Sequence, residues 1–114
     1  MCHLFAGIPA EDIEGETRSV RLGGHSTSIR LEAAFWRTLE SLAEGQNMSL
    51  AKFLTTLHDE VLDLNGEVRN FASHLRCACL VYLERRSQQQ SARHAAARID
   101  RLRQEPAEPL PLAS

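Results

Sequence analysis

Residues 26–31 alternate between polar and less polar side chains, the period of two that is typical of a strand with one buried face. The core side of this predicted strand carries Thr27, Ile29 and Leu31, and the outward side carries Ser26, Ser28 and Arg30. The pattern therefore predicts a short strand with an apolar face and a polar, hydroxyl-rich face.

Residues 18–22 predict a second strand, which a Gly-Gly turn joins to the first. The register that a two-residue turn imposes places Val20 opposite Thr27, on the apolar side. The same register places Arg18 opposite Ile29, where an apolar residue would be expected. The sequence leaves open whether this extra strand lies beside the other strand or over its outer face.

Apolar residues at helical spacing predict three helices after the strands. The first spans residues 33–44 and ends at a glycine, and the second begins with Ser49 as its N-cap. The third begins near Asn65 or Asn70 and has no sequence signal for its end before Pro106. The apolar faces of the three helices carry Phe35, Trp36, Leu39, Leu42 and Ala43; Leu50, Leu54, Leu57 and Val61; and Phe71, Leu75, Ala78, Cys79 and Tyr82.

The chain has 114 residues, which is enough for one domain with short appendages. We divide it into an acidic N-terminal segment (residues 1–16), a domain that includes the third helix (17–83), an Arg-rich segment (84–105) and a disordered C-terminus (106–114). The Arg-rich segment is either a solvated helical extension or a frayed tail.

A short strand with three small helices cannot satisfy its own backbone or cover its apolar face. The simplest completion is a second copy, with two strands pairing antiparallel about a two-fold axis and the helices of both protomers closing one core. The sequence therefore predicts an intertwined homodimer that is mainly α with a short β-ribbon.

Charge has to be considered locally, because 13 basic and 15 acidic residues give a net charge of −2. Residues 17–31 hold three arginines, one histidine and no acid, whereas residues 11–16 hold four acids that could screen them.

No apolar run approaches the roughly 20 residues of a membrane span, and Met1–Ala10 lacks the basic start of a signal peptide. Three cysteines, an odd number, imply no disulfide framework. We expect a cytoplasmic protein with no membrane partner.

Two stretches of the chain resemble the ribbon-helix-helix family of DNA-binding proteins. They are Thr-Ser-Ile-Arg-Leu-Glu-Ala-Ala-Phe-Trp at residues 27–36, with Leu39, Leu42 and Ala43 after it, and Met-Ser-Leu-Ala-x-Phe-Leu at residues 48–54. Adding Arg-Ser-Val-Arg-Leu at residues 18–22 makes the chain similar to a bacterial subfamily of small, mostly uncharacterised proteins. The chain departs from the typical member in having Glu32 where a proline usually follows the strand, a third long helix and the extra N-terminal strand.

The resemblance implies a sequence-specific transcriptional regulator, a repressor, whose two-stranded ribbon lies in the major groove of double-stranded DNA. The base contacts would come from Ser26, Ser28 and Arg30. The phosphate contacts would come from Arg21 and from the start of the second helix, with Ser49, Leu50, Ala51 and Lys52.

Other interpretations stay open. The same dimer could be an adaptor or antitoxin-like module that binds a second protein through the third helix and the C-terminal tail. A DNA-binding protein would keep the outward strand face exposed, whereas an adaptor could cover it with the extra strand. A thiol or metal sensor using Cys77 and Cys79 is a third possibility, but His74 and Cys77 alone do not make a metal site. Cys2 resembles the nucleophile of glutamine amidotransferases, for which the chain is too short, so we expect no enzyme, metal or cofactor.

Overall fold

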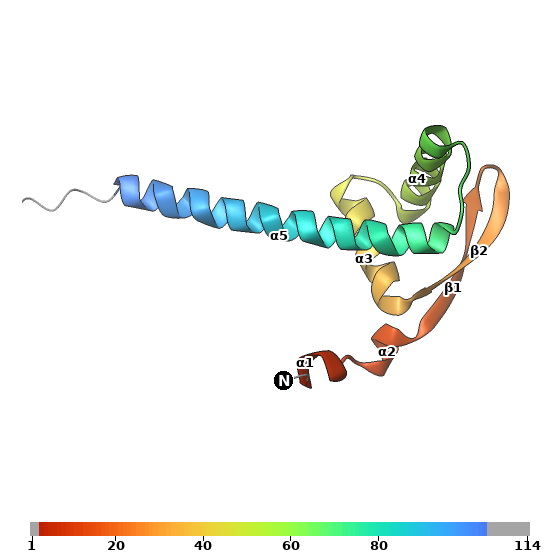
Figure 1. The fold of residues 1–114 in the computed structure, drawn as a ribbon, viewed down its shortest axis with the longest axis horizontal. Coiled ribbons are helices and arrows are strands. Elements are labelled where there is room, and N and C mark those ends of the chain that lie inside the picture. Colours follow the sequence, from red (N-terminus) through yellow and green to blue (C-terminus); the bar gives the residue numbers. More distant parts are fainter. Residues whose placement is uncertain (1–2, 105–114) are drawn as a thin grey trace, which may run out of the picture. The chain divides into compact units, whose positions relative to one another are not determined.

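The chain forms two antiparallel strands followed by helices, after a short N-terminal segment (Figure 1). The computed structural model describes residues 3–104. Its elements are α1 (His3–Ala6), α2 (Ala10–Ile13), β1 (Gly15–Leu22), β2 (His25–Glu32), α3 (Ala33–Gly45), α4 (Leu50–Asn65) and α5 (Phe71–Gln104). They belong to two compact units that divide after Tyr82. The predicted fold class, a short β-ribbon with helices and a long C-terminal helix, is confirmed.

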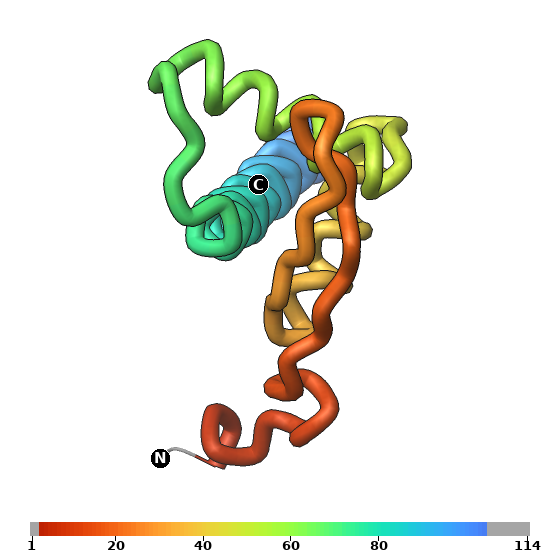
Figure 2. The backbone as a smooth tube through the Cα atoms, turned by 90° about the vertical axis from the view of Figure 1, so that its right-hand side faces the viewer, coloured from red at the N-terminus to blue at the C-terminus, as the bar shows by residue number. Residues whose placement is uncertain are grey.

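β1 and β2 form a hairpin in the register that the Gly-Gly turn predicts (Figure 2). Val20 lies opposite Thr27, and Arg18 lies opposite Ile29. Both glycines of the turn have positive φ angles, 57° and 81°, which residues with side chains rarely adopt. The pairing continues to Gly15, so β1 begins earlier than the sequence predicts.

One edge of β2 faces away from β1. In an antiparallel pair, residues that exchange backbone hydrogen bonds alternate with residues that do not, and a two-residue turn is closed by a hydrogen-bonded pair. With this register, Thr27, Ile29 and Leu31 bond to β1, so the N–H and C=O groups of Ser26, Ser28 and Arg30 point away from it. Within residues 3–104 the sheet has two strands, so no strand pairs with this edge.

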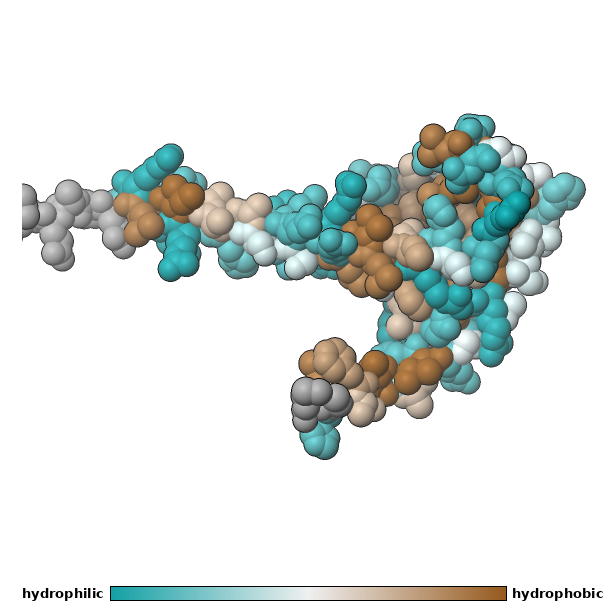
Figure 3. Space-filling model, in the orientation of Figure 1, coloured by the Kyte–Doolittle hydropathy of each residue, from teal (hydrophilic) through white to brown (hydrophobic). Residues whose placement is uncertain are grey.

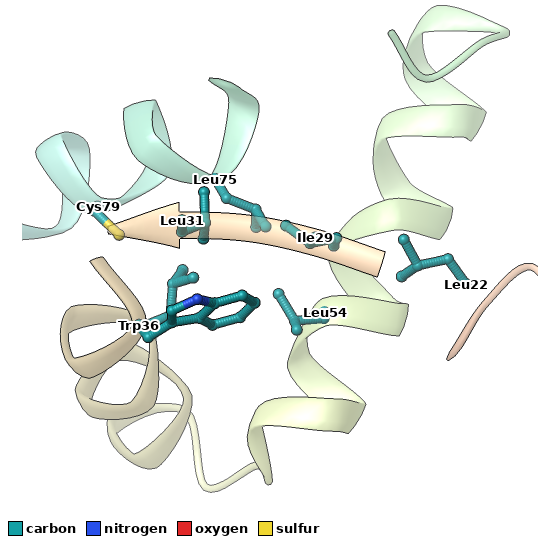
Figure 4. Packing of buried hydrophobic residues seen from close by; sticks show 8 residues of the cluster. Leu22, Ile29, Leu31, Trp36, Leu54, Leu75 and Cys79 are labelled. Atoms are coloured by element: carbon teal, nitrogen blue, oxygen red, sulfur yellow. The ribbon is translucent and has the colours of Figure 1, made fainter. Parts of the chain in front are cut away.

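The core lies between the inner face of the hairpin and the helices (Figure 4). Its buried members are Leu22, Ile29, Leu31, Trp36, Leu39, Leu54, Leu75 and Cys79. The predicted burial of Ile29 and Leu31 is therefore confirmed. The predicted burial of Thr27 is wrong, because α4 packs on β1 rather than on β2, and Thr27 is left exposed.

Arg18, the polar residue on the apolar side, is accommodated by Trp36 and two carboxylates. Its Cζ lies 4.8 Å from the centroid of the Trp36 ring. Its Nη2 lies 3.1 Å from Glu16 Oε2, and its Nη1 lies 2.8 Å from Glu40 Oε1. The aliphatic part of the side chain can thus cover the core while the guanidinium is paired with charge at its rim.

The helix boundaries follow capping residues. Ser49 accepts a hydrogen bond from the backbone N–H of Lys52 at 3.2 Å, which confirms it as the N-cap of α4. Gly66, in the left-handed conformation, ends α4. Asn70 Oδ1 accepts from the N–H of Ser73 at 3.3 Å, so α5 begins after Asn70, and Asn65 is the last residue of α4.

α5 contributes Leu75 and Cys79 to the core of the first unit and continues as one helix to Gln104. The side chains of residues 83–104, which form the described part of the second unit, are exposed. None of the helices between residues 3 and 104 has the length and hydropathy that a membrane crossing requires. Cys2 and the predicted disordered residues 106–114 lie outside the described residues.

Candidate nucleic-acid interface

The outer face of the hairpin consists of six exposed side chains from both strands. They are Thr17, Ser19 and Arg21 from β1 and Ser26, Ser28 and Arg30 from β2. β1 lies beside β2 in one sheet and does not cover this face. The surface along the hairpin is accordingly teal and white, hydrophilic to neutral, in Figure 3.

Neither arginine of the outer face forms an ion pair within residues 3–104, although the carboxylate of Glu32, two residues along β2, interacts with Arg30 through charge. Within the described residues, neither Arg21 nor Arg30 has a carboxylate oxygen within 4.0 Å. Two of the four acids in residues 11–16 pair elsewhere, Asp12 with Arg37 and Glu16 with Arg18. These two acids therefore do not form ion pairs with the outer-face arginines.

Hydroxyl groups link the two strands across the outer face. The Oγ atoms of Ser19 and Ser26 are 2.9 Å apart, a hydrogen bond in which either residue can donate. Nη1 of Arg30 donates to Oγ1 of Thr17 over 3.5 Å, a long contact. Ser26 and Arg30 thus have partners on β1, and the sequence pattern does not assign these partners, Ser19 and Thr17, to the site.

The start of α4 is held against the end of β1 near the turn. The hydroxyl of Thr55 lies 2.9 Å from the backbone carbonyl oxygen of Arg21 and 3.0 Å from that of Ala51, and it can donate its one proton to either. One turn earlier on α4, the side chains of Ser49, Ala51 and Lys52 are exposed and that of Leu50 is half-buried. The first amides of a helix have no acceptor within it, so this end of α4 can offer N–H groups and one lysine to an anion.

Glu32 has a structural role. It occupies the position after the strand where the ribbon-helix-helix resemblance predicts a proline. Its carboxylate accepts hydrogen bonds from Nε and Nη2 of Arg76 at 2.8 and 3.3 Å. The Arg76 guanidinium also lies 5.9 Å from the centre of the Phe35 ring. The pair joins the end of β2 to α5, and the sequence gives no signal for it because 44 residues separate the partners.

The hydrogen bond from Arg76 lowers the pKa of Glu32, helped by a backbone hydrogen bond. A lowered folded-state pKa gives stability that is present above the ordinary glutamate pKa of about 4.3 and is lost as the pH falls through the folded value. We therefore expect Glu32→Gln to destabilise the protein at pH 7 and to have a smaller effect at pH 3, measured by urea unfolding. Glu67→Gln, which removes the exposed pair with Arg69, serves as the control. An equal loss at both pH values for Glu32→Gln would contradict this role.

Cys77 and Cys79, the cysteines within the described residues, do not form a common site. Cys79 is buried, and burial raises the pKa of its thiol to about 11, which keeps it protonated at neutral pH. Its Sγ lies 3.8 Å from the carbonyl oxygen of Phe35, whereas Cys77 is exposed. Within residues 3–104, no group of three or more metal-ligating side chains is close enough to hold an ion.

The hairpin, the two helices after it and the start of α5 match a known domain. Residues 15–83 match the family model described as "Ribbon-helix-helix domain". The chain belongs to the ribbon-helix-helix family. Proteins of this family are typically non-enzymatic and bind DNA, and their domains generally dimerise. The part of α5 that follows Leu83 lies outside the ribbon-helix-helix match.

A solved structure supports the same fold. The chain is similar to an uncharacterized protein from Bordetella pertussis Tohama I, with 36% sequence identity and a TM-score of 0.75. The similarity covers 78% of this ribbon-helix-helix chain and 71% of that protein. No curated protein matches the chain significantly.

Proposed function

We propose that this protein is a sequence-specific DNA-binding regulator, a transcriptional repressor without enzymatic activity, that uses the outer face of its hairpin. The observation that carries the proposal is that this face is uncovered and holds Arg21 and Arg30 among hydroxyl groups, with no carboxylate paired to either. Arginine can bind guanine in bidentate fashion, and hydroxyl groups can donate to or accept from a base edge. Membership of a family that typically binds DNA supports the same conclusion.

The open edge of β2 is the proposed site of homodimerisation. Two β2 strands that pair antiparallel through these edges would form a four-stranded sheet with β1 of each copy outermost. At about 4.8 Å between strands, the two outer strands would lie about 14 Å apart, whereas the major groove is about 12 Å wide. The two β2 strands would therefore lie over the groove, and each β1 would lie near a phosphate backbone.

This geometry divides the contacts between the strands. Ser26, Ser28 and Arg30 on β2 would reach the base edges and specify sequence. Arg21 on β1 would contact phosphate. So would the first turn of α4, through the amides of Leu50 and Ala51, the cap Ser49 and the ammonium group of Lys52.

Selection from a pool of random duplexes with the full-length protein tests the proposal. We expect enrichment of a palindromic sequence, as the two-fold symmetry of a dimer requires. Arg30→Ala should cost about 1–3 kcal/mol on that sequence and relax the preference at one base pair per half-site. Lys52→Ala should weaken binding to all sequences and reduce the salt dependence by about one ion per half-site.

Arg69→Ala is the matched control, because it removes one exposed arginine from the loop between α4 and α5. It should leave the sequence preference unchanged. An unenriched pool, obtained with protein that is folded and dimeric, would contradict direct recognition of DNA sequence.

A protein partner is the second candidate function, as an adaptor or antitoxin-like module. The observation that favours it is the exposure of Leu80 and Val81 on α5, at 61% and 50%. Exposed apolar side chains also colour part of α5 brown in Figure 3. Binding of a second protein through α5 would require these two residues and would not require Arg30.

A further inference from the structure

The guanidinium group of Arg30 lies across the first residue of β1. A Cβ atom added to Gly15 would lie 2.7 Å from both Nε and Nη2 of Arg30 and 2.8 Å from its Cζ. Carbon atoms pack against such groups at about 3.5–4.0 Å, so the space that Arg30 occupies exists because residue 15 has no side chain. Gly15 does not have a positive φ, so its backbone conformation does not demand glycine.

The strand register explains why these two residues meet. Thr17 is directly opposite Arg30, and Gly15 is the diagonal neighbour of Arg30 on the same outer face. Thr17 Oγ1 accepts the long hydrogen bond from Nη1, on the guanidinium whose Nε and Nη2 lie over Gly15. Two residues of β1 thus lie against the charged group of a β2 residue.

We propose that Gly15 and Thr17 are positioning residues for Arg30, so that β1 contributes to base recognition without touching a base. The proposal rests on the proposed function, in which Arg30 contacts a base. A long side chain that is already ordered loses less rotamer freedom when it binds. A side chain at residue 15 would displace the guanidinium and leave it mobile. Binding to DNA would then have to restrict the rotamers of Arg30, which lowers the affinity.

The first test measures the position of Arg30 without DNA. Relaxation of the Nε–H signal in ¹⁵N NMR reports the mobility of the guanidinium, and Arg30→Lys identifies the signal by its loss. We expect a restricted Nε–H in the native protein and a more mobile one in Gly15→Ala and Thr17→Val. Gly45→Ala is the control, because nothing lies within 4 Å of a Cβ at residue 45. Equal mobility in the native protein and both variants would overturn the proposal.

The second test uses the duplex selected by the native protein. Gly15→Ala should reduce the discrimination at the base pair read by Arg30 by about two- to tenfold and leave the salt dependence unchanged. Adding Gly15→Ala to Arg30→Ala should cause no further loss of discrimination, because the positioned group is already absent. A loss that adds to that of Arg30→Ala would show a general structural effect and overturn the proposal.

The two tests separate the two hypotheses. If no duplex is enriched but the Nε–H of Arg30 is more mobile in Gly15→Ala than in the native protein, the positioning of Arg30 is supported and the DNA-binding function is contradicted. If a duplex is enriched but Gly15→Ala changes neither mobility nor discrimination, the function stands and the positioning fails. Thermal unfolding of Gly15→Ala close to that of the native protein would show that both tests concern a folded protein.

Discussion

Replacing Ser28 with proline is expected to prevent two copies from pairing while each copy keeps its hairpin. The N–H of Ser28 points to the open edge of β2, so its loss removes a donor from a partner strand and none from the pairing with β1. The side chain of Ser28 is exposed, so no core contact is lost. Light scattering should report the mass of a monomer, and circular dichroism should report folded protein.

Thr27→Pro is the matched control for this change. Thr27 is also exposed, but its N–H faces β1, so proline there should disrupt the hairpin itself. A dimer of unchanged mass for Ser28→Pro would show that the copies associate through another surface. Unfolding of Ser28→Pro would instead indicate that the fold depends on the second copy.

Replacing Trp36 with alanine is expected to have the largest effect on stability. The side chain is fully buried between the hairpin and the helices, and its removal should lower the free energy of unfolding by about 3–5 kcal/mol. Its Nε1–H also donates to the backbone carbonyl of Glu16 at 2.8 Å, which ties α3 to β1. Trp36→Phe should cost about 1–3 kcal/mol, because the hydrogen bond from the indole to Glu16 is lost while much of the ring volume remains.

Urea unfolding measures both variants, and Ser41→Ala, at an exposed site on the same helix, serves as the control with an expected change within about 0.5 kcal/mol. A loss below about 1 kcal/mol for Trp36→Ala would mean that the indole is not part of the core.

Much of the fold could be predicted from the sequence because its signals are local. Alternation predicted β2, helical spacing predicted α3 and α4, and the Gly-Gly turn set the hairpin register. The contacts that anchor Arg18 and Glu32 could not be predicted, because Glu40 and Arg76 lie 22 and 44 residues away in the chain. Periodicity also gave no signal for α1 and α2, which have four residues each and therefore show barely one helical turn.

The candidate site was predicted only in part. Alternation placed Ser26, Ser28 and Arg30 on one face, and their exposure is confirmed, while their contacts with DNA stay predictions. The contributions of Thr17 and Gly15 were missed, because they depend on which residues lie diagonally across two strands at the far end from the turn. β1 begins at Gly15, before the apolar alternation that predicts a strand from residue 18, so periodicity gives no signal for residues 15–17.

The hairpin also determines the order in which the ribbon can assemble. All pairs between β1 and β2 form within residues 15–32 around a two-residue turn, so the entropy cost of closing the loop is small. Hairpins of this kind form in about 1–10 μs, without waiting for an encounter between molecules. A strand that depended on a second copy would fold at a rate set by protein concentration. β2 acquires its first neighbour in a unimolecular step, so the proposed pairing of two copies would join preformed sheets. The first phase of refolding should therefore be independent of protein concentration.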